Sequence, residues 1–85
     1  MAEVLIGKIS DYFAKIGVAA LTITDGELRA GDTIHITGHT TDLEQKVNSM
    51  QSEHETIEVA KTGVGVGIKV KERVRDGDKV YKVID

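Results

Sequence analysis

This sequence lacks cysteine and proline altogether, and its 85 residues include only three aromatic side chains, Tyr12, Phe13 and Tyr81. Without cysteine, neither a disulfide framework nor a thiolate metal site can form. With so few aromatics, the core has to be built mainly from valine, isoleucine and leucine. Long hydrophobic runs are missing too, because no stretch approaches the roughly 20 apolar residues that a membrane-spanning helix needs.

The charge and the N-terminal residues limit which cellular location and which partners we expect. The formal net charge is −3, from 11 basic and 14 acidic side chains. That balance argues against tight, indiscriminate binding to nucleic acid, although it is compatible with a local basic stripe. Met1-Ala2-Glu3-Val4 shows no basic region followed by an apolar run. We therefore expect no signal peptide, no membrane partner and a cytoplasmic location.

The residues that are plentiful favour strands. Valine, isoleucine and threonine carry branched Cβ atoms that suit a pleated sheet. Apolar patterning predicts seven strands: Glu3–Ile9, Gly17–Ile23, Thr33–Thr37, Leu43–Met50, Thr56–Ala60, Val64–Val74 and Lys79–Ile84. A bulge or strand end is expected at Met50, where the alternation changes parity. A helix over Asp42–Glu55 is the alternative, because Leu43, Val47 and Met50 also follow helical spacing.

Glycine-containing turns separate these segments. Asp25-Gly26 is a tight-turn dipeptide, and the strings Arg29-Ala30-Gly31-Asp32 and Arg75-Asp76-Gly77-Asp78 indicate one turn chemistry used twice. The predicted fold is all-β, a small closed antiparallel β-barrel of about six to seven short strands. Closure is expected because it removes exposed sheet edges. The chain length predicts a single domain over residues 1–85 with one modest core.

The order of the turns resembles a known family. Gly7-Lys8-Ile9, Gly17-Val18-Ala19, the hairpin from Gly26 to Ile34, and the segment from Ala60 to Ile68 follow one another as in the β-barrel domain II of translation GTPases of the elongation factor Tu type. More closely, the chain resembles stand-alone elongation factor-like proteins. The resemblance covers nearly the whole chain. It implies the barrel fold and a non-catalytic binding module that contacts RNA or a ribonucleoprotein.

Two departures from that family pattern matter. Val64 stands where the family has aspartate after the turn glycine, which puts the contacts of that loop in doubt. The parent factors hydrolyse GTP in a separate domain with a phosphate loop, and no Gly-x-x-x-x-Gly-Lys-Ser/Thr string occurs here. We therefore expect no nucleotide, no cofactor and no enzymatic activity.

The most informative segment for binding is the one predicted as the strand Val64–Val74. Alternate side chains of a strand point to opposite faces, which places one set inward, Val66, Ile68, Val70 and Val74, and a basic set outward, Lys69, Lys71, Arg73 and Arg75. Four cations about 6.6–6.8 Å apart would form a ridge able to neutralise phosphates of RNA. The alternative is that they only solubilise an edge strand.

Two further features have both a functional and a structural interpretation. Tyr12 and Phe13 beside Lys15 could stack on a nucleic-acid base, or Phe13 could plug one end of the barrel with Tyr12 packed alongside. His35, His39 and His54 show no metal-ligand spacing with one another, so no metal site is expected. The string His39-Thr40-Thr41-Asp42 could place an imidazole near a carboxylate, but turn capping by Thr41 and Asp42 explains it as well.

The leading functional hypothesis is therefore an RNA-binding or ribosome-binding module, with Lys69, Lys71, Arg73, Arg75, Tyr12 and Lys15 as its contact residues. The rival is a protein-interaction adaptor, or an accessory barrel that docks on a larger enzyme. Similar barrels occur as appended domains of larger enzymes, including a family of peptidases. The net negative charge favours the rival and the basic segment favours RNA. A monomer or a weak dimer is expected, because an exposed edge strand could pair with a second copy.

Overall fold

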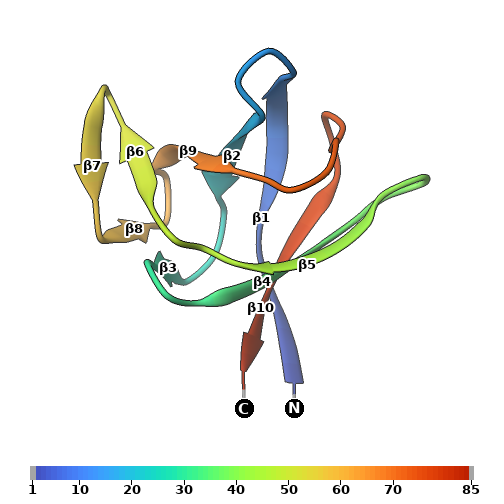
Figure 1. Ribbon diagram of the computed structural model, residues 1–85. Coiled ribbons are helices and arrows are strands. Elements are labelled where there is room, and N and C mark those ends of the chain that lie inside the picture. The colour runs from blue at the N-terminus through green and yellow to red at the C-terminus, as the bar shows by residue number, and fades with distance from the viewer. Residues whose placement is uncertain (1, 85) are drawn as a thin grey trace.

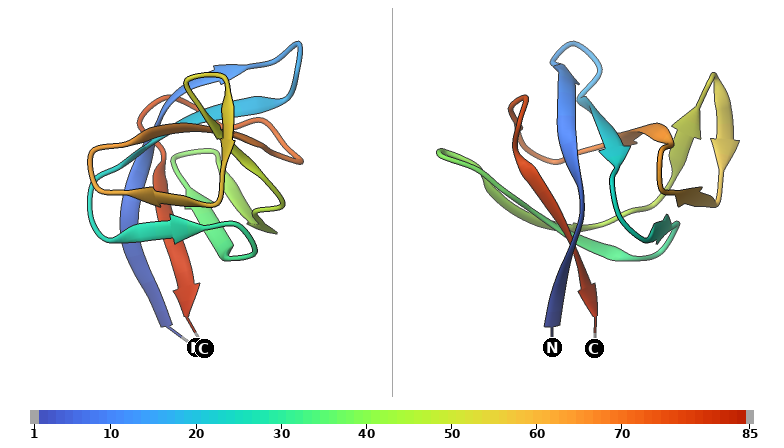
Figure 2. Two further views of the ribbon diagram at one scale, coloured as in Figure 1. Left: turned by 90° about the vertical axis from the view of Figure 1, so that its left-hand side faces the viewer. Right: turned by 180° about the vertical axis from the view of Figure 1, so that it is seen from behind.

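The computed structural model describes residues 2–84 and contains ten short strands. They are β1 (Ala2–Phe13), β2 (Val18–Ile23), β3 (Glu27–Arg29), β4 (Thr33–Thr37), β5 (Asp42–Lys46), β6 (Met50–Ser52), β7 (Glu55–Ile57), β8 (Val59–Lys61), β9 (Gly65–Lys69) and β10 (Lys79–Ile84). The strands curl around one interior, and β1 and β10 leave it as a paired ribbon that carries both chain ends (Figures 1 and 2). Ala2 lies opposite Ile84 in that ribbon.

The predicted all-β class is confirmed, but the predicted closed barrel of six to seven strands is wrong. Eight strands form one antiparallel sheet in the order β5-β4-β10-β1-β2-β9-β6-β7, and β3 pairs with β8 in a second, two-stranded sheet. The large sheet has two edges, at β5 and at β7. Among residues 2–84, no ladder joins these two edges, so the sheet does not close.

The core consists of aliphatic side chains, as the shortage of aromatics predicts. Alternation puts every second residue of β2 and β4 inside. The four residues predicted to point inward near the C-terminus, Val66, Ile68, Val70 and Val74, are all buried. Most of the remaining core comes from Ile6, Ile9, Leu21, Ile23, Leu28, Ile34, Ile36, Leu43, Met50 and Val80.

Several predicted strand bounds are right and others are not. The strands Thr33–Thr37 and Lys79–Ile84 are confirmed as β4 and β10. The segment predicted as Leu43–Met50 divides into β5 and β6 close to the expected break, and β3 was not predicted. The predicted strand Val64–Val74 ends at Lys69. No helix occurs among residues 2–84, so the helical alternative for 42–55 is wrong and no described helix could span a membrane.

The two similar turn strings form the same hydrogen-bonded structure, as predicted. In the first, the Asp32 N–H donates to the carbonyl of Arg29 at 3.0 Å, and the Asp32 carboxylate accepts the Arg29 N–H at 2.8 Å. In the second, Asp78 makes the same two bonds with Arg75, at 3.1 and 2.9 Å. The glycine between them has a φ of +99° or +91°, which side chains rarely adopt.

The turn in which Val64 replaces the family's aspartate keeps the backbone part of this structure. The Val64 N–H donates to the carbonyl of Lys61 at 3.0 Å, and Gly63 has a φ of +92°. The Val64 side chain packs against the core instead of accepting a backbone hydrogen bond. A hydrophobic contact therefore takes the place of the aspartate bond in this turn.

Candidate functional site

The predicted basic ridge is not a continuous strand face. Lys69 is the last residue of β9, whereas Lys71, Arg73 and Arg75 lie in the loop that leads to β10. All four side chains are exposed. The Val70 N–H still donates to the carbonyl of Gly17, next to β2, at 2.9 Å, but the Lys71 N–H donates to the Gln45 side chain, so the strand does not continue.

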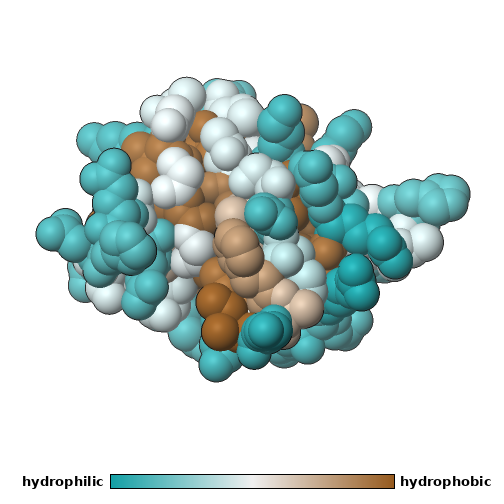
Figure 3. Space-filling model, turned by 90° about the horizontal axis from the view of Figure 1, so that it is seen from above, coloured by the Kyte–Doolittle hydropathy of each residue, from teal (hydrophilic) through white to brown (hydrophobic). Residues whose placement is uncertain are grey.

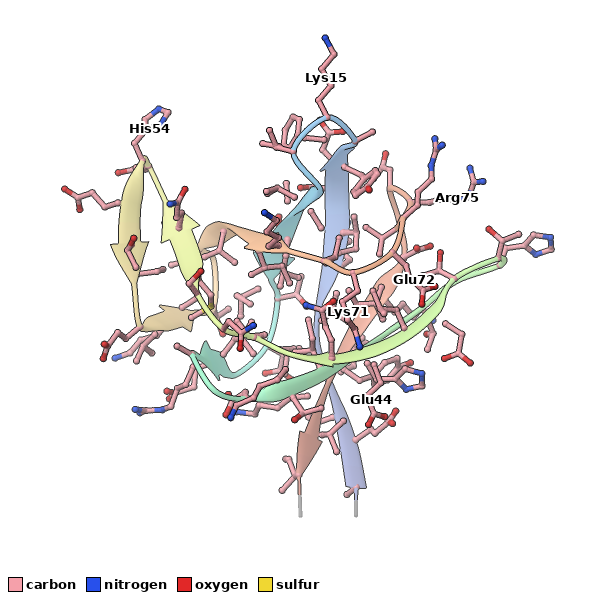
Figure 4. All side chains as sticks on the ribbon, in the orientation of Figure 1. Lys15, Glu44, His54, Lys71, Glu72 and Arg75 are labelled. Carbon is pink, nitrogen blue, oxygen red and sulfur yellow. The ribbon has the colours of Figure 1, made fainter. Side chains whose placement is uncertain are left out.

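The loop separates the four cations. The Arg75 Nε donates to the Thr40 hydroxyl at 3.0 Å, which turns this side chain toward the β4–β5 connection. Lys71 leaves the loop in another direction, so the labelled Lys71 and Arg75 do not form one row (Figure 4). The even spacing that suggested a match to successive phosphates is therefore wrong.

Two of the predicted cations instead border a groove at the open seam of the sheet. This seam groove has a volume of about 540 Å³ and is lined by Gln45, Lys46, Asn48, Ser49, Lys69, Val70 and Lys71. Three of these residues are lysines. Among residues 2–84, the ion pairs involve other side chains than these three. The groove is therefore bordered by positive charge that the described residues do not neutralise.

Gln45 spans the seam. Its Nε2 donates to the carbonyl of Lys69 at 2.8 Å, and its Oε1 accepts the Lys71 N–H at 2.9 Å. One side-chain amide thus offers the backbone a donor and an acceptor, as a neighbouring strand would. The edge strand β5 is joined here to the end of β9 and the residues after it by a side chain instead of a ladder.

Tyr12 and Lys15, the other predicted contact residues, lie on the β1–β2 hairpin. Tyr12 is half-buried and packs against the core, as the structural interpretation predicted. Lys15 lies in the turn and points away from the molecule (Figure 4). Phe13 does not plug the interior, because 47% of it is exposed. Tyr12 therefore supports the core, whereas Phe13 faces outward and the role of plug expected of it is wrong.

Phe13 borders a second hollow, which we call the hairpin groove. It has a volume of about 370 Å³, and β1, β2, β6, β9 and the β6–β7 turn line it. Ile16, in the β1–β2 turn, is 61% exposed, more than any other large apolar residue among residues 2–84. We call Phe13 and Ile16 the apolar tip. Apolar surface is visible among polar atoms on the face seen from above, where this hairpin ends (Figure 3).

The β6–β7 turn at the hairpin groove has an unusual backbone. Glu53 and His54 have φ values of +52° and +67°, although neither is glycine or asparagine. Two central residues with positive φ are typical of a type I′ hairpin turn, which glycine and asparagine adopt more easily. His54 is exposed at the end of this hairpin (Figure 4).

His35 has polar partners that come from distant parts of the sequence. Its Nδ1 lies 2.9 and 3.0 Å from the two carboxylate oxygens of Glu3, and its Nε2 lies 2.5 Å from Asp42 Oδ1. Hydrogen bonds to Asp42 and then to Glu3 raise the pKa of His35 above 6.5, and partial burial opposes them. Glu44 lies opposite His35 on β5.

Glu3, His35 and Glu44 are thereby brought together, and one donor atom from each lies within 4.8 Å of the others. Spacing along the chain gave no sign of this group, because Glu3 and His35 are far apart in sequence. The usable signal was register: residues opposite each other on paired strands share a face. The sequence analysis did not predict this group of three side chains.

The comparisons place the relatives of this chain among proteases. No family model matches it. It is 44% identical over 81 residues to a collagenase of Porphyromonas gingivalis, and 41% identical over 80 residues to an uncharacterized protease of Methanocaldococcus jannaschii. These matches cover 94% and 93% of this chain but 20% and 19% of the relatives. The chain thus spans about a fifth of the length of the curated relatives it matches.

Solved structures show the same fold. The C-terminal domain of a Geobacillus thermoleovorans protein named as a U32 peptidase superposes with a TM-score of 0.87 at 19% identity, covering 94% of this chain and 92% of that one. GDP-bound aIF5B from Aeropyrum pernix superposes with a TM-score of 0.66 at 13% identity, over 98% of this chain and 14% of that one. Identities this low carry information on fold alone.

The resemblance to elongation factor-like proteins is therefore wrong as a statement of kinship. Substantial sequence identity leads to proteins named as collagenase and protease. The function inferred from that resemblance, an RNA-contacting translation module, is wrong with it. The rival interpretation, an accessory domain of a larger enzyme, agrees better with relatives of which the chain matches about a fifth.

Proposed function

We propose that this chain is a non-catalytic accessory domain that docks on the catalytic part of a larger, peptidase-related enzyme. The observation that carries the proposal is sequence identity of 41–46% over nearly the whole chain with about a fifth of proteins named as collagenase or protease. The matched residues make up nearly the whole of the fold described above. If this chain shares a role with these relatives, it is therefore the role that one such domain has within a larger protein.

The geometry of the domain supports an accessory role. The described ends, Ala2 and Ile84, are partners in the β1–β10 ribbon. Any segment joined to either end would therefore meet the fold on the same side. The solved C-terminal domain from Geobacillus shows that this fold also exists as a separate unit. What the described residues offer is surface for binding: two grooves and an apolar tip.

The apolar tip is the surface that we assign to docking on the catalytic domain. Phe13 and Ile16 are 47% and 61% exposed, and an aromatic side chain beside an aliphatic one is a typical anchor in protein interfaces. The hairpin groove beside Phe13 supplies concave surface around the anchor. The tip lies at the opposite end of β1 from the ribbon (Figure 1), so a tether at the ribbon leaves it free.

The experiment starts from affinity capture with the tagged chain, with and without ribonuclease, and identification of the captured proteins. We expect a peptidase-related protein that is retained after ribonuclease treatment. The purified pair is then compared by isothermal titration calorimetry for wild type and for Phe13→Ser/Ile16→Ser. The double variant should bind at least about tenfold more weakly, since truncating anchor residues costs more than 1 kcal/mol.

The matched control is Val4→Ser/Ile84→Ser, which removes two apolar residues of similar exposure from the ribbon. It should bind as the wild type does. Partners that disappear on ribonuclease treatment would contradict the proposed function. A peptidase-related partner that binds both double variants equally well would contradict the assigned surface.

A further inference from the structure

The group around His35 is separate from both grooves and from the apolar tip. Its members come from three strands: Glu3 from β1, His35 from β4, and Asp42 and Glu44 from β5. His35 and Glu44 are opposite each other, and Glu3 reaches them across β10, whose Tyr81 is the other neighbour of His35. Glu44 projects from the outer side of β5, near the place where β1, β4 and β10 cross in this view (Figure 4).

The donor atoms are close enough to share one ion. One atom each from Glu3, His35 and Glu44 lies within 4.8 Å of the others. A zinc ion sits about 2.0–2.2 Å from imidazole nitrogen and carboxylate oxygen, so its ligand atoms lie closer together than that limit. The two glutamates are exposed and can rotate inward to close the remaining gap.

Asp42 gives independent support, because it orients the imidazole. Its carboxylate lies 2.5 Å from His35 Nε2 and can accept the proton on that nitrogen. Metal-binding histidines typically donate their other ring N–H to a carboxylate, which fixes the tautomer and raises the basicity of the binding nitrogen. With its proton held on Nε2, His35 turns the Nδ1 lone pair toward Glu3, which lies 2.9 Å away.

The charge of the group also favours a cation. Three carboxylates, from Glu3, Asp42 and Glu44, surround one imidazole. Even a protonated ring balances only one of them, so an excess of negative charge remains. A divalent ion would neutralise that excess while taking the place of the Nδ1 proton.

We propose that Glu3, His35 and Glu44 form a binding site for a divalent transition metal of the zinc type, with Asp42 as the positioning residue for His35. One imidazole and two carboxylates suit zinc better than calcium or magnesium, which prefer oxygen donors alone. The bound ion would tie the first strand to β4 and β5 across β10. It would therefore stabilise the fold as its concentration rises.

The test is calorimetric titration of the chelator-treated 85-residue chain with zinc chloride at neutral pH, together with melting temperatures. We expect one zinc per chain and a rise in melting temperature of several degrees. His35→Asn and Glu44→Gln should each abolish the one-to-one isotherm. Asp42→Asn should weaken it about 10–100-fold, the usual effect of losing a carboxylate that holds a metal-binding histidine.

The matched controls are His54→Asn, in the β6–β7 turn, and Glu55→Gln, next to it on β7. Both should bind zinc as the wild type does. An unchanged isotherm in His35→Asn, equal binding of calcium and zinc, or absence of zinc binding by the wild type would each overturn the proposal. Melting temperatures of the metal-free variants separate a lost site from a lost fold.

Discussion

The seam groove and the cluster around His35 share β5 but differ in the sign and in the pairing of their charges. Gln45 and Lys46 border the groove together with Lys69 and Lys71. Asp42 and Glu44 lie beside His35. In the cluster, the imidazole contacts two carboxylates at 2.5–3.0 Å, whereas the described residues give the groove lysines no ion-pair partner.

This difference shows that a net charge of −3 does not describe the local surface. The negative charge is partly gathered into one group that holds a histidine, and positive charge is gathered across the seam. Paired charges are positioned for a small ligand or an ion. Unpaired cations on a groove are positioned for a larger partner, or they keep an open sheet edge from pairing with another chain.

The largest effect is expected from breaking the groove itself. Gln45→Ala removes the amide that bonds to the backbone at Lys69 and Lys71. The free energy of unfolding should fall by about 1–2 kcal/mol, because two hydrogen bonds are lost and their backbone partners turn to water. Chemical denaturation measures the loss, and hydrogen exchange should accelerate at the Lys71 amide.

Gln51→Ala is the matched control, since Gln51 is exposed on β6 and none of the described side-chain hydrogen bonds involves it. It should change the free energy of unfolding by less than about 0.5 kcal/mol. Equal stability of the two variants would mean that the Gln45 amide does not hold the seam, and the groove would lose its structural basis.

A smaller effect is expected from the charges of the cluster. In metal-free protein the pKa of His35 lies above 6.5, with the bond to Asp42 as its largest cause and the bond to Glu3 next. Asp42→Asn should therefore lower this pKa more than Glu3→Gln does. Nuclear magnetic resonance of the imidazole protons at a series of pH values measures both shifts. A larger shift from Glu3→Gln would reverse the assigned order.

The raised pKa also has a consequence for stability. The folded state binds the proton more tightly than the unfolded state, so the contribution is complete below the ordinary histidine pKa and is lost as the pH rises through the folded value. The stability difference between wild type and His35→Asn should therefore shrink as the pH rises above the ordinary histidine pKa of about 6.5. Denaturation of both proteins with chelator present measures it. A constant difference would show that His35 acts only by packing.

Much of the fold could be predicted from the sequence because its signals are local. Strict alternation marked Thr33–Thr37 and Lys79–Ile84, and glycines with positive φ marked the paired turns. The strand ends at Lys69 for a nonlocal reason: two residues on, the Lys71 N–H bonds to the side chain of Gln45 on β5. The prediction of a closed barrel failed for the same reason, because no local signal in the sequence shows that the Gln45 side chain takes the place of a ladder.

The misassigned kinship has a physical explanation. Gly7, the first glycine of the apparent family pattern, has no room for a side chain, because an added Cβ would lie 2.3 Å from the carbonyl oxygen of Thr22. Gly31 is required by its positive φ. Residues that the fold itself demands can recur wherever the fold occurs. The superposition on aIF5B at 13% identity shows that proteins of very different sequence share this fold. Such a pattern predicts architecture, and it gives no information on which protein carries it.

The smallest effect on stability is expected from the groove lysines, and it decides what their charge is for. Lys69→Gln/Lys71→Gln removes two exposed cations for which the described residues supply no ion pair, so the free energy of unfolding should change by less than about 0.5 kcal/mol. A loss above about 1 kcal/mol would show that these lysines are paired, and the contrast with the His35 cluster would disappear. With stability unchanged, sedimentation at rising protein concentration separates the two roles: self-association of the double variant indicates that the lysines protect the open seam, whereas a monomer with weakened binding to a purified partner indicates that they contact it.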